Sequence, residues 1–303
     1  MTAVPMPKRH ITFSEKGDFM KISEILKSKE ITVSIEIFPP KLGTELEESR
    51  KVVAEMASLK PDFISVTYGA AGTTSRFTAE LADCVEQNGI PALAHVTCVS
   101  SDKNSLSDYL SSLKENGIDN VLALRGDMPQ GREPKKDFAH ASDIAKAIKD
   151  LGDFCVGGAC YPEGHPEAKN VSADIDALKI KAESGCEFFT TQMFFDNEVM
   201  YSFLSKFQRK GINIPVIAGV MPITNAKQLS RSVALSGTSV PRTLREMVER
   251  FGDCPEAMKQ AGIAFATNQI IDLIANGVNN IHIYAMNKPE VAAKILENLS
   301  AIR

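Results

Sequence analysis

Polar side chains stand at regular positions within apolar, β-rich segments of this chain, where they could carry out acid–base chemistry. In the segment TVSIEIF, Ser34 and Glu36 alternate with aliphatic residues. Because every second residue of a strand points to the same face, these two side chains should lie opposite the aliphatic ones. Burial raises the pKa of a carboxyl group toward the range in which it can act as a general acid. A structural Glu36 that bridges Ser34, Thr67 or His95 is an alternative that strand position alone leaves open.

The same alternation places further polar residues on one face of two neighbouring segments. DFISVTY turns Ser65 and Thr67 to one face, and PALAHVTC does the same with His95 and Thr97. The interior of a parallel barrel is normally filled by branched apolar side chains. Polar residues there on successive strands therefore predict a polar site, in which each group must be paired or hydrated.

A charged turn and an amide occur at the ends of two later segments. Arg125, Gly126 and Asp127 close the segment NVLALRGD, where the glycine lets the backbone approach a ligand between opposite charges. Gln192 in TTQMFFD has the parity of an inward residue, and its amide could pair with a flat heterocycle through donor and acceptor together. A solvated Arg-Gly-Asp turn and a Gln192 satisfied by neighbouring backbone are equally compatible with these short patterns.

The cysteine and histidine spacing argues against a metal site. Cys155, Cys160 and His165 are spaced C-x4-C-x4-H, which fits no common zinc site, and the two cysteines would face opposite sides of a strand. The sequence has no G-x-G-x-x-G after a strand, no GK[ST] phosphate loop, no H-E-x-x-H and no G-x-S-x-G. We expect no metal, and a nucleotide cofactor would have to be held by loops at the strand ends.

Eight β-rich segments could hold these residues side by side. Their successive starts are 30, 29, 29, 34, 34, 26 and 67 residues apart, and one strand with a helix and two loops needs about 30 residues. We predict an α/β fold, a (β/α)8 TIM barrel; the alternative, an open doubly wound sheet, would be expected to show an early glycine-rich turn if it bound a dinucleotide. The segments begin at Thr32, Asp62, Pro91, Asn120, Phe154, Phe188, Ile214 and Ile281.

Helical patterns fill the intervals between the segments. Residues 45–59 place apolar side chains on one helical stripe, as an amphipathic helix requires. The last interval is about one unit too long, so we predict extra helices between strands 7 and 8, on the face where barrel active sites lie. Residues 1–19 have no periodicity and are expected to form a loosely ordered extension. Residues 20–303 are expected to form a single catalytic barrel.

Composition narrows the functional class. The 303 residues carry 34 Lys and Arg against 38 Asp and Glu, a net charge of −4, whereas nucleic acids and anionic membranes attract basic proteins. The longest apolar run, residues 214–221, is far shorter than the roughly 20 residues of a membrane span. The 6 cysteines form no C-x-x-C pair and are typical of reduced thiols. We expect a cytoplasmic protein with no nucleic-acid partner and no membrane span.

Five motifs, in order along the chain, resemble those of the bacterial, single-domain methylenetetrahydrofolate reductase family. They are EIFPPK from Glu36, SVTYGA from Ser65, residues 122–129, YPEGHPEA from Tyr161 and TQMFFD from Thr191. The resemblance spans about residues 34–288. It implies a (β/α)8 barrel that binds FAD at the carboxyl ends of its strands. It also implies reduction of 5,10-methylenetetrahydrofolate to 5-methyltetrahydrofolate by NAD(P)H in a ping-pong cycle, a reaction of one-carbon metabolism and methionine biosynthesis.

The resemblance further implies roles for individual residues. Glu36 would protonate the leaving nitrogen as the imidazolidine ring opens to an iminium cation, and Asp127 would stabilise that cation. Asp127 near the flavin would also make the reduced flavin a better hydride donor. Gln192 would pair with the pterin, and Gln228 and Lys288 are implied as further substrate contacts.

The flavin positions implied by the resemblance come from several strand ends and the loops that follow them. Among them, Arg125 and Lys181 suit the pyrophosphate and Asp174 suits a ribose hydroxyl. The chain departs from the family at Ala177 and Ile180, where relatives often carry polar or basic residues, and at Lys288, where arginine is usual. These departures bear on adenine-side binding and on the contact with the folate tail. The full set is Thr67, Tyr68, Ala70, His95, Arg125, Gly126, Asp127, Ala141, Tyr161, His165, Ala168, Asp174 and Lys181.

Two other functions stay open. Another flavin barrel, such as an amino-acid dehydrogenase, would not need Glu36 and Asp127 together. A non-catalytic or partner-dependent flavin- or folate-binding subunit of a larger one-carbon complex is the second alternative, because some family members work beside a metal-carrying subunit. The sequence does not decide between NADH and NADPH or between a monomer and a homo-oligomer.

Overall fold

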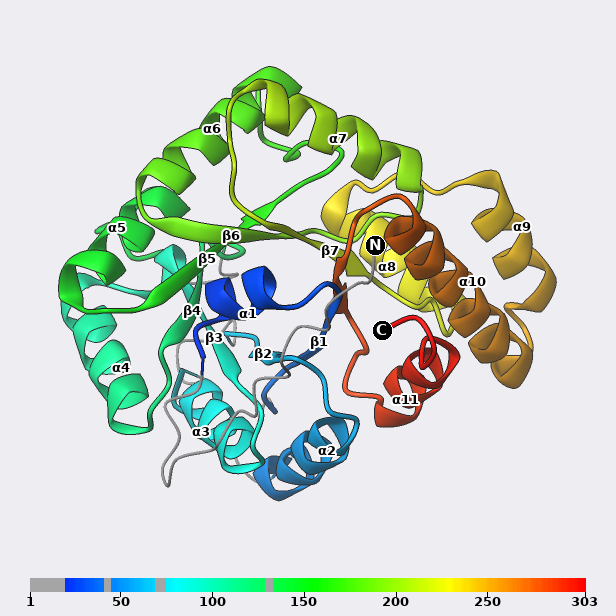
Figure 1. Cartoon of the computed structure of the whole chain (residues 1–303), viewed down its shortest axis with the longest axis horizontal. Helices are drawn as coiled ribbons and strands as arrows, with labels where there is room; N and C mark the ends of the chain where they lie inside the picture. The colour runs from blue at the N-terminus through cyan, green and yellow to red at the C-terminus, as the bar shows by residue number, and fades with distance from the viewer. Residues whose placement is uncertain (1–19, 41–44, 69–74, 129–132) are drawn as a thin grey trace, which may run out of the picture.

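The computed structural model describes residues 20–40, 45–68, 75–128 and 133–303, and in this part eight parallel strands close into a barrel in sequence order (Figure 1). The predicted (β/α)8 barrel is confirmed, and each strand begins within two residues of its predicted start. The strands are β1 (Thr32–Ile37), β2 (Ile64–Val66), β3 (Ala92–Thr97), β4 (Asn120–Leu124), β5 (Cys155–Cys160), β6 (Cys186–Thr191), β7 (Val216–Val220) and β8 (Asn280–Ile283).

Helices surround the barrel and cover the aliphatic face of its strands. Ile35 and Ile37 of β1, for example, are buried in the core between strands and helices. No helix among the described residues is long and apolar enough to cross a membrane. The surrounding helices are α2 (Leu46–Ser58), α3 (Ser75–Gln87), α4 (Lys103–Glu115), α5 (Ala141–Leu151), α6 (Val171–Glu183), α7 (Asn197–Arg209), α10 (Pro255–Ala275) and α11 (Pro289–Asn298), and a short 3₁₀ turn, η2 (Cys98–Ser100), precedes α4.

The interval between β7 and β8 contains the predicted extra helices. α10 packs against α7 and α11, so it is the helix that completes the ring. The additional helices are α8 (Ala226–Ser236) and α9 (Arg242–Phe251), and α9 lies outside α10 in Figure 1. They share a separate apolar cluster in which Leu229, Leu244 and Met258 are buried. This cluster stabilises the insertion without drawing on the main core.

The first helix, α1 (Ile22–Ser28), closes the amino-terminal end of the barrel and lies over its centre in Figure 1. Ile22 and Ile25 pack with Phe63, Leu93 and other residues from the beginnings of the strands. The Ile22 amide also donates to Asn120 Oδ1 over 2.8 Å. Among the described residues this end is therefore filled by apolar side chains.

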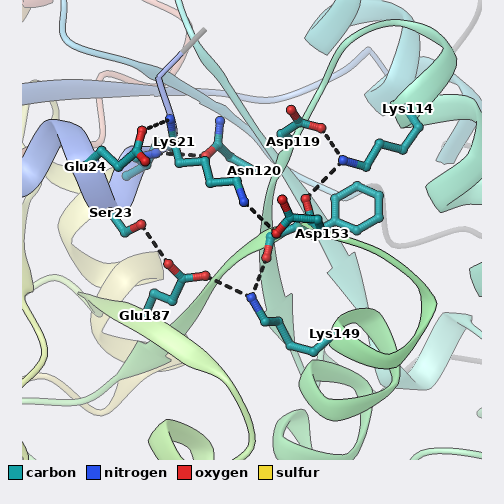
Figure 2. A network of polar contacts seen from close by, with 11 residues as sticks. Lys21, Ser23, Glu24, Lys114, Asp119, Asn120, Lys149, Asp153 and Glu187 are labelled. Carbon is teal, nitrogen blue, oxygen red and sulfur yellow. Dashed lines mark hydrogen bonds and ion pairs between the residues drawn. The ribbon is translucent and has the colours of Figure 1, made fainter. Parts of the chain in front are cut away.

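A network of charges fixes α1 to the strand starts, as Figure 2 shows. Lys21 Nζ pairs with Asp153 over 2.6 Å, and Ser23 Oγ donates to Glu187 over 2.7 Å. Lys149 in turn pairs with Glu187 over 3.1 Å. These partly exposed contacts orient the helix, whereas the apolar cluster beneath it supplies most of the binding free energy.

Candidate functional site

A cavity of about 890 Å³ opens at the carboxyl end of the barrel, and strand ends together with the loops after β4 and β5 line it. Glu36, Asp127 and Gln192 all lie in its wall. So does every described residue of the implied flavin set, while Ala70 falls outside the described residues. The structure therefore gathers at one site the side chains that strand parity turned inward and those that the family resemblance implied.

Glu36 lies between two buried imidazoles. Its Oε2 is 3.8 Å from His95 Nε2 and 3.9 Å from His282 Nε2, and the side chain is 21% exposed. Burial lowers the pKa of His95 to about 4, although the Glu36 carboxylate opposes the shift. His95 is therefore neutral at pH 7 and adds no positive charge beside Glu36.

β8 and the residue that follows it contribute two cavity residues that the sequence analysis missed. The His282 ring forms a hydrogen bond with Ser34, whose Oγ lies 2.7 Å from the ring Nδ1. Tyr284 donates its hydroxyl to Thr191 O over 2.6 Å. Burial, with the nearby Glu36 carboxylate, raises the pKa of Tyr284 well above its usual value, so the phenol stays protonated. The alternation in IHIYAM, which separates both residues from Ile281 and Ile283, was a signal that could have found them.

The end of β4 brings a cation and a close backbone approach to the cavity. Arg125 pairs through both terminal nitrogens with the carboxylate of Glu167, and this contact raises the pKa of Arg125. Gly126 has φ +85°, and a Cβ at this position would come within 2.8 Å of Thr97 Cβ and of Val99 Cγ2. Only glycine therefore fits here, because a larger side chain would meet Thr97 and Val99. Asp127 follows and is exposed.

The loop after β5 adds two rings, and α6 adds two half-buried ionisable groups. Tyr161 and His165 pack edge to face with 4.7 Å between their ring centroids. Asp174 accepts a hydrogen bond from the His165 amide over 3.2 Å, and burial raises the pKa of its carboxyl group. Lys181 donates to Ala159 O over 2.8 Å, and burial lowers the pKa of its ammonium group. An anion placed beside Lys181 would favour the charged form of this lysine.

Two buried polar atoms of the cavity wall have no hydrogen-bond partner among the described residues. They are His95 Nε2 and Thr97 Oγ1, and both residues line the cavity. Buried donors and acceptors are normally satisfied, so these atoms indicate a polar ligand. Together with the cations Arg125 and Lys181, and with the glycine that admits a close approach, they fit a flat polar ring system that carries phosphates.

The outer end of the cavity is apolar. Ala141 begins α5, and Ala177 and Ile180 of α6 face the same space. Ile180 is 55% exposed, an unusual position for a large aliphatic side chain. A ring bound here would be held by contact area on these residues rather than by hydrogen bonds to their side chains.

Of the three residues implied for substrate binding, one lines the cavity and two do not. Gln192 lies in the cavity wall, and its Oε1 accepts from the Met193 amide over 3.0 Å. Gln228 and Lys288 are not part of the wall. The Gln228 amide bonds to the loop before it, accepting from the Thr224 amide and donating to Pro222 O, and Lys288 Nζ donates to Thr224 Oγ1 over 2.8 Å. The structure therefore joins both residues to the loop after β7, at Thr224, rather than to the cavity.

Cys155 and Cys160 are buried free thiols. Cys155 packs in the cluster under α1, whereas Cys160 packs in the outer core, so the two lie on opposite sides of β5 as the parity predicts. No group of three or more His, Cys, Asp or Glu side chains is arranged to hold a metal in the part of the chain that the structure describes.

Comparison with known proteins gives consistent results. The family model described as methylenetetrahydrofolate reductase matches residues 21–300. The 5,10-methylenetetrahydrofolate reductase of Pectobacterium carotovorum subsp. carotovorum is 34% identical over 270 residues, covering 89% of this chain and 90% of that protein. The Escherichia coli (strain K12) protein of the same name is 34% identical, covering 89% and 91%. Among solved structures, an uncharacterized Clostridium thermocellum protein described as binding two copies of 5-methyl-5,6,7,8-tetrahydrofolic acid matches with a TM-score of 0.67 at 19% identity, covering 94% of this chain and 100% of that one.

Proposed function

This chain belongs to the methylenetetrahydrofolate reductase family, and we propose that it reduces 5,10-methylenetetrahydrofolate to 5-methyltetrahydrofolate with FAD as cofactor and NAD(P)H as donor. Family membership supports the reductase activity. The proposal adds the two nucleotides, a ping-pong cycle through one shared site, residues 20–303 as the catalytic barrel, and a cytoplasmic location.

The observation that carries the proposal is that Glu36 and Asp127 line one cavity. A reductase that opens a ring needs a proton donor at the leaving nitrogen and a negative charge near the cation that results. Glu36 is the candidate donor, and Asp127 is the candidate counter-ion. The partial exposure of Glu36 lets its proton be replaced from solvent between turnovers.

The cavity wall supports FAD as the group that occupies it. His95, Thr97 and Tyr161 would contact the ring system, while Arg125 and Lys181 would hold the phosphates. When bound, FAD supplies the hydride transfer between nicotinamide and folate that no side chain can perform. Gln192 would orient the pterin through its amide, and the description of the Clostridium thermocellum barrel as a folate binder is consistent with a folate ligand.

A visible spectrum of the purified protein, taken under anaerobic conditions, tests the proposal. We expect a yellow protein that NADH or NADPH bleaches and that methylenetetrahydrofolate then reoxidises. A flavin that the folate fails to reoxidise but that an amino acid reduces would identify a different flavin barrel. A flavin that neither nicotinamide reduces would point to a non-catalytic binding subunit, and a protein that refuses FAD would overturn the proposal.

A further inference from the structure

The turn after β8 contains two consecutive non-glycine residues in the left-handed region. Met286 has φ +55° and Asn287 has φ +53°. Side chains with a Cβ are disfavoured in this region, Asn less than most. Such strain persists where surrounding contacts enforce it, and it is concentrated at functional sites. The turn follows Tyr284, a residue of the cavity wall.

The contact that this turn makes possible is a double hydrogen bond to Phe38, the residue that follows β1. Asn287 Nδ2 donates to Phe38 O over 2.9 Å, and its Oδ1 accepts from Phe38 N over 3.0 Å. A side-chain amide presents the same donor and acceptor as a peptide group. The Asn287 side chain therefore forms with Phe38 the two hydrogen bonds that a peptide group of a neighbouring strand would form.

The double hydrogen bond lies where the ladder between β1 and β8 has ended. β8 pairs with β1 only as far as Ile35, opposite Ile283. On the other side, β2 continues beside β1 to Ile37, and the Thr67 amide donates to Ile37 O over 3.0 Å. Glu36 thus lies beyond the last β8 pairing of β1, between Ile35 and Phe38, the residue that Asn287 binds.

The neighbours of Asn287 in the same turn tie it to the rest of the barrel mouth. Tyr284 bonds to the end of β6 at Thr191, and Lys288 bonds to Thr224 in the loop after β7. The turn therefore connects three strand ends around Glu36 and has little freedom to follow β1 if that strand moves.

We propose that Asn287 is a positioning residue that fixes the end of β1 and with it the carboxyl group of Glu36. The inference rests on the proposed function of Glu36 as the proton donor. Phe38 is two residues beyond Glu36, about 7 Å along the strand. Loss of the hydrogen bonds from Asn287 to Phe38 would let Glu36 move away from its place between His95 and His282. The rate of proton transfer falls steeply when the donor is displaced even slightly.

Two glycine variants separate positioning from backbone strain. Asn287→Gly removes the double hydrogen bond, and glycine accepts the left-handed conformation. Met286→Gly makes the same kind of backbone change at the preceding residue and leaves the double hydrogen bond of Asn287 in place. Met286 is 40% exposed and does not line the cavity, so it is the matched control.

The measurement compares the two half-reactions of the holoenzyme by stopped-flow absorbance. In Asn287→Gly we expect flavin reduction by the nicotinamide to stay within twofold of the parent protein and reoxidation by methylenetetrahydrofolate to fall at least tenfold. Met286→Gly should change neither rate more than twofold. Amide hydrogen exchange should be faster at Phe38 in Asn287→Gly alone. A general loss of structure would slow both half-reactions and release flavin, so the ratio of the two rates is the informative quantity.

The inference is overturned if Asn287→Gly reoxidises as fast as Met286→Gly, or if both half-reactions fall together. The outcome is distinct from failure of the proposed function, which would appear in the parent protein as a flavin that folate does not reoxidise. In that event the amide exchange at Phe38 still tests whether Asn287 fixes the end of β1.

Discussion

Glu167 occupies both terminal nitrogens of the Arg125 guanidinium at the mouth of the cavity. Arg125 is the residue proposed to hold the cofactor phosphates, so its carboxylate partner stands where an anionic ligand would bind. Glu167 is largely exposed, and its carboxylate is readily solvated once released. The pair therefore keeps Arg125 oriented but opposes phosphate binding by the same guanidinium.

Glu167→Gln should tighten FAD binding, because it removes the carboxylate that competes with the phosphates for Arg125. The gain should be severalfold, up to about fivefold, because exposed ion pairs are weak. Quenching of flavin fluorescence on titration measures the dissociation constant. Glu133→Gln, an exposed change of the same charge in the segment after β4, is the control and should have no effect beyond about 1.5-fold. Weaker binding in Glu167→Gln would show that orientation of Arg125 outweighs competition.

Gly126→Ala should weaken FAD binding at least tenfold and lower stability by about 2 kcal/mol or more, because the added Cβ meets Thr97 and Val99 at 2.8 Å. Gly89→Ala is the matched control, since Gly89 has a similar φ of +79° and open space around it. That variant should lose only about 1 kcal/mol, the strain of the left-handed conformation. Urea denaturation and flavin titration compare the two. Equal losses in both variants would remove the argument for a close approach at Gly126.

Glu36→Gln should keep the flavin bound and bleached by NAD(P)H but lose folate reduction by at least 100-fold, a loss typical of removing a general acid. Single-turnover reoxidation of the prereduced protein measures the effect. The unchanged nicotinamide half-reaction serves as the internal control. Folate turnover at a parental rate would mean that Glu36 is not the proton donor.

Segment spacing predicted the closed barrel, strand parity predicted the inward side chains of its strands, and the family resemblance implied the residues that the loops and helices contribute. Because inward and outward residues alternate, the positions of Glu36, Thr67, His95 and Gln192 followed from four short segments once a closed barrel was assumed. The spacing of the β-rich segments supplied that assumption, since each unit has the length of one strand, one helix and two loops.

Contacts between distant side chains could not be predicted in the same way. The pairing of Arg125 with Glu167 and of Asn287 with Phe38 depends on where two loops meet, which no local pattern encodes. The position of Gln228 shows the same limit: its amide is occupied by the loop after β7, a local alternative that the residue type does not reveal.

A buried carboxyl group outside the site provides a test of stability against pH. Glu86 at the end of α3 accepts from the Ala92 amide over 2.9 Å, and its buried Oε2 has no partner among the described residues. Burial, opposed by the bond from Ala92 and assisted by the nearby carboxylates of Asp119 and Asp83, raises the pKa of Glu86 to about 8. The folded protein therefore prefers the protonated form, while the unfolded chain ionises near the ordinary value of about 4.5.

The sign of the effect follows from linkage. The stabilisation from protonated Glu86 is fully present below about pH 4.5 and is lost as the pH rises through about 8. Glu86→Gln stays neutral throughout, so its melting temperature should exceed that of the parent by a few degrees at pH 8.5 and by much less at pH 5. Glu55→Gln, an exposed change on α2, controls for the lost charge and should show no such divergence. Calorimetric melting curves for the three proteins at pH 5, 7 and 8.5 would make the comparison, and a difference that stays constant with pH would mean that Glu86 is ionised in the folded protein.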